Sequence, residues 1–233
     1  LDAAGKQFAA DTGAKVKIQT QQWDGITTKL TTALAQSDAP DVVDLGNTQV
    51  PVYAAAGGLT DLTPYRDELK DGQTWLTGLE GPATVDGKLY GAPLFAGNRA
   101  VVYDKQVWKD AGVTDVPTTY DELTADLDKV KAANPASDFS AFYMPGQYWY
   151  GGLQWVWDAG GEIATDKGGK WTGTLDSADA VKGLTAWKDF QNAYSAKSTQ
   201  DINTDKPSQS DVFAQGNTSA FLGSAWEIGS ITT

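Results

Sequence analysis

The feature that most constrains the fold is an alternation of helical and strand-like patterns along the first part of the chain. Helical spacing over residues 1–8 ends at Gly13, and an alternating strand pattern over residues 15–19 follows it. A second helical pattern covers residues 26–34, and a short apolar run over residues 41–45 predicts a buried strand. Because strands that alternate with helices form parallel sheets covered by helices, we expect an α/β fold.

Polar side chains follow the predicted strand over residues 41–45. Asn47, Thr48 and Gln49 stand directly before a predicted helix that ends at Gly57. Ligands of open α/β sheets bind beyond the carboxyl ends of the strands, so these three uncharged side chains suit a ligand rich in hydroxyl groups. Asn47 or Thr48 is equally suited to cap the helix, and the two roles are compatible.

The composition excludes several classes of function. The chain has no His and no Cys, which removes nucleophiles and metal sites built on imidazole or thiolate groups. We find no calcium-binding loop either, and we expect neither a metal nor a cofactor. The net charge is −12, so the chain has no basic surface for nucleic acid. No apolar run approaches the roughly 20 residues that span a bilayer.

Local signals predict several further elements. Asp86-Gly87 predicts a tight hairpin turn, and residues 101–103 and 139–144 read as strands. Thr119 and Glu122 have the spacing of a capping box, and Ser177 is placed to cap a longer helix.

Aromatic residues are abundant, with nine Trp and nine Tyr. Their rings stack on the apolar faces of sugars while planar polar side chains bind the hydroxyl rim. Tyr148, Trp149 and Tyr150 are expected in a loop between a strand and a helix, either stacking on a ligand or folded onto the core. Trp155 and Trp157 cannot share a helix face, so we expect one in the core. Four other tryptophans are expected to pack inside, namely Trp75, Trp108, Trp171 and Trp187.

A set of segments, in its order and spacing, resembles the extracellular solute-binding proteins of sugar-importing ABC transporters, the group typified by maltose-binding protein. These segments are Phe8–Val16, Pro40–Val43, Tyr53–Leu62, Asp86–Pro93, Val102–Lys105, Pro117–Leu123 and Phe213–Trp226.

The resemblance implies two α/β lobes hinged around an interlobe ligand cleft, as in the periplasmic-binding-protein-like fold. The chain would cross between the lobes near residues 97–99. The N-terminal lobe then covers residues 1–98 and the C-terminal lobe residues 99–233. Both are expected to be partial, because the family pattern includes a first strand and a C-terminal return segment that we do not find.

The resemblance also places sugar contacts. Tyr150 and Trp226 match stacking positions of the family, and residues 47–49 match a segment of polar contacts. Asn98 and Arg99 lie at the crossover, although Arg99 is equally suited to pair with a surface acid. The expected substrate-binding set is Trp23, Asn47, Thr48, Gln49, Asn98, Arg99, Tyr148, Trp149, Tyr150, Trp226 and Glu227. For Trp23, stacking and simple helix cover stay open, and the role of Glu227 is open too.

The function that the resemblance implies is non-enzymatic binding of a mono- or oligosaccharide and its delivery to the permease subunits of an ABC importer. We expect a monomer outside the cytoplasm, as a cell-surface lipoprotein or a periplasmic protein. One alternative is a secreted glycoside hydrolase, which needs two carboxylates across the scissile bond. Another is a binding protein for a non-sugar solute such as a polyamine.

Overall fold

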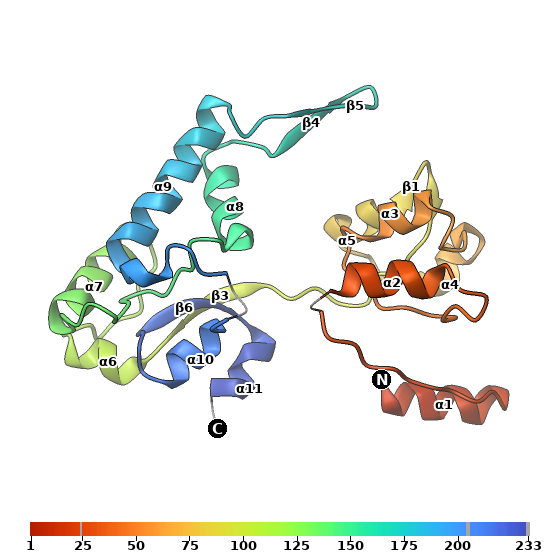
Figure 1. Cartoon of the computed structure of the whole chain (residues 1–233), viewed down its shortest axis with the longest axis horizontal. Helices are drawn as coiled ribbons and strands as arrows, with labels where there is room; N and C mark the ends of the chain where they lie inside the picture. The colour runs from red at the N-terminus through yellow and green to blue at the C-terminus, as the bar shows by residue number, and fades with distance from the viewer. Residues whose placement is uncertain (24, 204–205, 232–233) are drawn as a thin grey trace. The chain divides into compact units, whose positions relative to one another are not determined.

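The computed structural model describes residues 1–23, 25–203 and 206–231, and the chain divides into two compact units (Figure 1). Unit 1 is Leu1–Ala96 and unit 2 is Gly97–Thr233. The sequence places the division between Asn98 and Arg99, at the start of the first strand of unit 2. None of the described helices is long and apolar enough to cross a membrane.

Unit 1 consists of short helices and one small hairpin. Its elements are α1 (Asp2–Thr12), α2 (Ile26–Leu34), α3 (Val50–Ala55), the 3-10 helix η1 (Thr63–Tyr65), α4 (Arg66–Lys70), α5 (Thr77–Ala83), β1 (Thr84–Val85) and β2 (Lys88–Leu89).

The predicted punctuation of unit 1 is confirmed at two turns. Helix α1 ends at Gly13, which adopts a left-handed conformation with φ 72° and so closes the last turn. Strands β1 and β2 pair antiparallel around Asp86 and Gly87, whose φ values of 49° and 77° are those of a type I′ turn.

The two strands predicted over residues 15–19 and 41–45 do not form. Both segments are irregular, and Val42 is 90% exposed. A strand exists only through ladder hydrogen bonds to a neighbour, and no such ladder holds either segment within the described residues. The alternation over residues 15–19 does survive locally, because Val16 and Ile18 both face Gly5 of α1.

Unit 2 contains the longer helices and the buried strand pair. Its elements are β3 (Arg99–Tyr103), α6 (Lys105–Asp110), α7 (Tyr120–Ala133), α8 (Trp149–Asp158), β4 (Ala164–Lys167), β5 (Lys170–Gly173), α9 (Ala178–Tyr194), η2 (Lys197–Thr199), α10 (Gln209–Ala214), β6 (Ala220–Ser224), η3 (Ala225–Glu227) and α11 (Ile228–Ile231).

Strands β3 and β6 pair antiparallel at the centre of unit 2, with Arg99 opposite Ser224 and Tyr103 opposite Ala220. Every residue of β6 is buried, because side chains cover both of its faces. The predicted strand over residues 139–144 is reduced to two parallel bridges, Ser140 to Thr218 and Tyr143 to Phe221. All three ladders of the described residues are antiparallel, so the expected parallel sheet is represented by these bridges.

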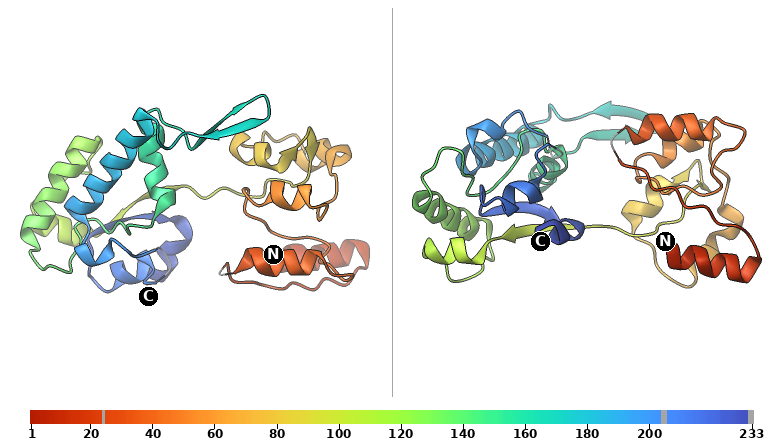
Figure 2. Two further views of the ribbon diagram at one scale, coloured as in Figure 1. Left: turned by 45° about the horizontal axis from the view of Figure 1, so that its top comes forward. Right: turned by 60° about the horizontal axis from the view of Figure 1, so that its bottom comes forward.

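Helices α7, α8 and α9 cover the main core of unit 2. That core includes the buried side chains of Trp108, Leu127, Met144 and Phe190, against which Trp155 packs. Helices α8 and α9 contact each other closely along their length (Figure 2).

The predicted helix caps of unit 2 are confirmed. Thr119 and Glu122 form a reciprocal capping box at the start of α7. Ser177 accepts a hydrogen bond from the backbone N–H of Ala180 and caps α9.

The expected packing of Trp171 is wrong. Trp171 lies on β5, in a hairpin that extends away from α8 and α9 (Figures 1 and 2), and it is 70% exposed. Trp108, by contrast, is buried as predicted. The large apolar side chain of Trp171 favoured a buried position, but the β4–β5 hairpin holds this residue away from the core.

Candidate functional site

The register of the β3–β6 pair brings together residues that are far apart in the sequence. Because Arg99 lies opposite Ser224, the short helix η3, which carries Trp226 and Glu227, begins beside the first residue of β3. Tyr148 is the N-cap of α8, and its hydroxyl reaches Arg99. Unit 2 thus gathers three of the sequence-predicted segments at one end of its strand pair.

Arg99 lies among aromatic rings. Its Nε donates a hydrogen bond to the Tyr148 hydroxyl. Its guanidinium carbon lies 5.7 Å from the ring centroid of Tyr148 and 5.2 Å from that of Tyr150. The ring of Trp149 stacks on Tyr150 with a centroid separation of 3.6 Å. A cation over aromatic faces is a favourable arrangement that holds the guanidinium in place.

Tyr148 lies inside the protein, unlike the two aromatic residues that follow it. It is 3% exposed, whereas Trp149 and Tyr150 are 53% and 51% exposed in the first turn of α8. The Tyr148 hydroxyl also donates to the carbonyl oxygen of Leu222, over 3.4 Å. Burial raises the pKa of the Tyr148 phenol, and the neighbouring Arg99 guanidinium opposes part of that rise. Trp149 and Tyr150 therefore lie in the first turn of a helix and not in the expected loop, and the buried Tyr148 precedes them as the N-cap.

Trp226 lies against the backbone of Gly97 and is 61% exposed. A Cβ added to Gly97 would lie 2.2 Å from Cζ3 of the indole, so only glycine permits this contact. Glu227 accepts the backbone N–H of Ser224 over 2.7 Å and closes a capping box with it. Asn98, between Gly97 and Arg99, is exposed.

The polar residues expected in unit 1 lie in the turn before α3. Asn47 and Thr48 are exposed, and Asn47 Nδ2 donates to the carbonyl oxygen of Gly78 over 3.3 Å. Gln49 is the N-cap of α3, but no side chain caps this helix. The Gln49 amide instead accepts from the backbone N–H of Gly46 and donates to the Thr27 hydroxyl, both over 3.1 Å. Asn47 and Thr48 therefore keep more hydrogen-bonding capacity than Gln49.

Trp23 is 62% exposed in unit 1. It follows the irregular segment that includes Val16 and Ile18, and its carbonyl oxygen accepts from the backbone N–H of Ile26 at the start of α2. Its indole is accessible to a ligand, and both roles expected for Trp23 stay predictions.

Gln209 belongs to this site although no sequence pattern predicts it. This residue is 3% exposed on α10, and its Nε2 donates to the carbonyl oxygen of Leu222 over 3.3 Å. Its Oε1 is buried with no hydrogen-bond partner among the described residues. No local pattern marks this residue, because its significance comes from the contact with β6.

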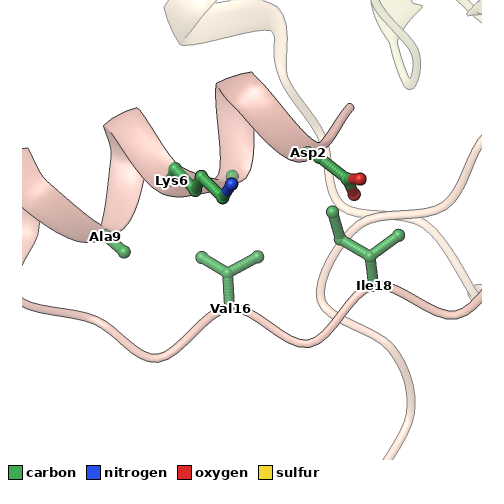
Figure 3. Close-up of a pocket in the computed structure, with 6 residues that line it drawn as sticks. Asp2, Lys6, Ala9, Val16 and Ile18 are labelled. Atoms are coloured by element: carbon green, nitrogen blue, oxygen red, sulfur yellow. The ribbon is translucent and has the colours of Figure 1, made fainter.

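A groove in unit 1 does not have the chemistry of a polar ligand site. It measures about 310 Å³ and runs between α1 and the segment after it (Figure 3). Gly5, Ala9, Val16 and Ile18 form its walls, and the charged groups of Asp2 and Lys6 lie along α1. These walls suit hydrophobic packing rather than recognition of hydroxyl groups.

The described residues contain no group of three acidic side chains that could hold a metal ion. The site in unit 2 consists of aromatic rings, amide side chains, the Arg99 guanidinium and the Glu227 carboxylate, which already caps a helix turn.

Known proteins are similar to this chain in sequence and in fold. A model of the bacterial extracellular solute-binding proteins matches residues 1–231. The diacetylchitobiose binding protein DasA of Streptomyces coelicolor is 41% identical over 222 residues, which are 95% of this chain and 51% of that protein. The chain thus spans about half the length of this relative.

Solved structures of other proteins have a similar fold. An ABC transporter solute-binding protein from Thermotoga lettingae, bound with alpha-D-tagatose, aligns with a TM-score of 0.77 and 25% identity, over 99% of this chain and 59% of that one. The sugar-binding protein MalE from Xanthomonas citri aligns with a TM-score of 0.76 and 24% identity, over 99% of this chain and 58% of that one.

Proposed function

Because the chain belongs to the family of bacterial extracellular solute-binding proteins, we propose that it binds a carbohydrate and delivers it to the permease subunits of an ABC importer. The protein would act outside the cytoplasmic membrane, as a monomer that needs no cofactor and binds no nucleic acid. Its anchoring, by lipid or by confinement to a periplasm, belongs to the same proposal.

The observation that carries the proposal is the set of exposed aromatic rings around Arg99. Trp149, Tyr150 and Trp226 are each more than half exposed, although large aromatic side chains are mostly covered in soluble proteins. Aromatic faces beside a guanidinium supply both of the contacts that a sugar ring needs. Unit 1, taken by itself, has exposed polar and aromatic side chains of the same kinds at Asn47, Thr48 and Trp23.

The relative that is 41% identical to this chain is named for binding diacetylchitobiose, an acetylated amino-sugar disaccharide. This supports N-acetylated disaccharides as the first ligands to test. The Thermotoga lettingae structure holds a ketohexose, so monosaccharides belong in the same series.

We further propose that the protein is not an enzyme. Glycoside hydrolysis needs two carboxylates on either side of the scissile bond. Glu227 is the carboxylate nearest in sequence to the exposed Trp226, and it is engaged with the backbone of Ser224. The family consists of binding proteins, which supports transport rather than hydrolysis.

The experiment is a thermal-shift screen of the protein against diacetylchitobiose, its deacetylated form, neutral mono- and disaccharides, and spermidine. A ligand that binds only the folded state stabilises it by about 2.7 kcal/mol at a hundredfold excess over Kd. We expect a sugar to raise the melting temperature and spermidine to leave it unchanged. A response to spermidine alone would refute the proposal, as would sustained hydrolysis of an aryl glycoside.

A further inference from the structure

A short series of hydrogen bonds connects Arg99 to the buried side of the β3–β6 pair. Arg99 Nε donates to the Tyr148 hydroxyl, which donates in turn to the carbonyl oxygen of Leu222. Gln209 Nε2 donates to the same carbonyl oxygen. Tyr148 and Gln209 are each 3% exposed, so the surrounding packed side chains restrict the movement of both residues.

Among the described residues, the Arg99 side chain uses one of its donor groups, the Nε–H. Its two terminal nitrogens have no hydrogen-bond partner in the part of the chain that the structure describes, and no described carboxylate lies within ion-pair distance of them. The guanidinium is a rigid planar fork, so holding its Nε also sets the directions of the terminal N–H groups.

We propose that Tyr148 is a positioning residue: its hydroxyl orients Arg99 so that the terminal N–H groups bind oxygens of the ligand. Gln209 supports Tyr148 by holding the carbonyl oxygen of Leu222, to which both residues donate. This role differs from the stacking role expected for Tyr148, because a ring that is 3% exposed cannot lie on a sugar face. The inference rests on the proposed function.

A double-mutant cycle on sugar binding tests the proposal. Tyr148→Phe removes the acceptor of the Arg99 Nε–H, and Arg99→Lys keeps the charge but removes the fork. Each change alone should weaken binding about tenfold, the size expected for losing one hydrogen bond of a charged group. The double variant should bind no more weakly than either single variant, because both changes remove the same interaction.

Tyr143→Phe is the matched control. Tyr143 is 2% exposed in the same unit, and its hydroxyl has no hydrogen-bond partner among the described residues. Removing this hydroxyl should leave the affinity unchanged.

The outcomes separate the inference from the proposed function. If the wild-type protein binds sugar and the two changes act independently, or if Tyr148→Phe binds like the wild type, the positioning role is overturned and the proposed function stands. If the wild-type protein binds no sugar, the proposed function falls and takes this inference with it.

A second measurement needs neither a ligand nor a variant. The chain contains two arginines, Arg66 and Arg99, so 15N-arginine labelling gives two Nε–H signals. The Arg99 signal should exchange with water clearly more slowly than free arginine, because its Nε–H is bonded to a buried hydroxyl. Exchange as fast as that of free arginine would overturn the proposal even if Tyr148→Phe fails to fold.

Discussion

Trp226 combines an exposed indole with a close contact to the backbone of a glycine. Its ring lies on Gly97, where a Cβ would come within 2.2 Å, and it is 61% exposed. Trp226→Ala should weaken sugar binding by about 1–3 kcal/mol, because exposed aromatic anchors carry much of the binding energy of a site. Isothermal titration calorimetry measures this change.

Trp171 provides the control for Trp226. It is 70% exposed on β5, so Trp171→Ala removes a comparable indole away from the residues around Arg99. Its affinity should match that of the wild type. Equal losses in the two variants would argue against a binding platform at Trp226, as would an unchanged affinity in Trp226→Ala.

Tyr194 makes the stability of the fold sensitive to alkaline pH. Burial, assisted by the charge of Asp128, raises the pKa of Tyr194 from 10.0 to about 12. Its hydroxyl donates to the carbonyl oxygen of Thr124. Between these two values the unfolded chain has lost the proton and the folded protein still holds it, so the free energy of unfolding falls as pH rises through this window. Below pH 10.0 the tyrosine is protonated in both states, so its titration does not change the free energy of unfolding there.

Urea unfolding on either side of the lower value, at about pH 9 and about pH 11, measures this effect. Tyr194→Phe should reduce the loss of stability between these two conditions, and part of the loss should remain because burial also raises the pKa of Tyr143 and Tyr148. A variant that loses as much stability as the wild type would show that Tyr194 titrates normally.

At the scale of elements, the packing of α8 on α9 depends on a glycine. A Cβ on Gly183 of α9 would lie 2.3 Å from the carbonyl oxygen of Trp155 on α8. Because the atom in the way belongs to the backbone, Gly183→Ala should force the helices apart and destabilise the protein by about 1–3 kcal/mol. Guanidinium unfolding measures the difference.

Gly229→Ala is the matched substitution, also in a helix of unit 2. Apart from its chain neighbours and the backbone of its own helix, no described residue has an atom within 4 Å of a Cβ at Gly229 in α11. Alanine favours a helix over glycine by up to about 1 kcal/mol. This variant should be as stable as the wild type or slightly more so. If both alanines had the same effect, the close approach at Gly183 would not matter.

The elements that could be predicted from the sequence are those set by local chemistry. The capping box at Thr119 and the Asp86-Gly87 hairpin depend on residues a few positions apart, and both formed. The strands expected over residues 15–19 and 41–45 did not form, because a strand depends on a partner that its own residues do not specify.

The candidate site likewise contains residues that the sequence predicted and residues whose role depends on contacts between distant segments. Trp149 was selected for its aromatic side chain next to a predicted helix, and Tyr150 and Trp226 because they also match stacking positions of the resembled family. Their role in binding stays a prediction. The buried position of Tyr148 and the role of Gln209 depend on contacts with β6. The pairing of β6 with β3 joins residues about 120 positions apart, such as Ser224 and Arg99. A single sequence contains no local signal of that register.

At the scale of the whole molecule, the two units differ in how much they bury. Both clusters of buried apolar residues among the described positions lie in unit 2. In unit 1, helix α1 buries none of its residues, whereas α9 of unit 2 buries Ala180, Gly183, Phe190 and Gln191. An isolated helix shorter than about 12–15 residues is marginal in water, so α1 gains little stability from its own hydrogen bonds.

Amide hydrogen exchange should therefore separate these two helices. Both are α-helices with the same type of backbone hydrogen bond, so a difference in protection measures chiefly what tertiary packing adds. We expect the amides of α1 to exchange far faster than those of α9 over residues 183–191, with β6 as protected as α9. Equal protection in α1 and α9 would mean that α1 is held by contacts beyond those of the residues described, and the low stability expected for α1 would be wrong.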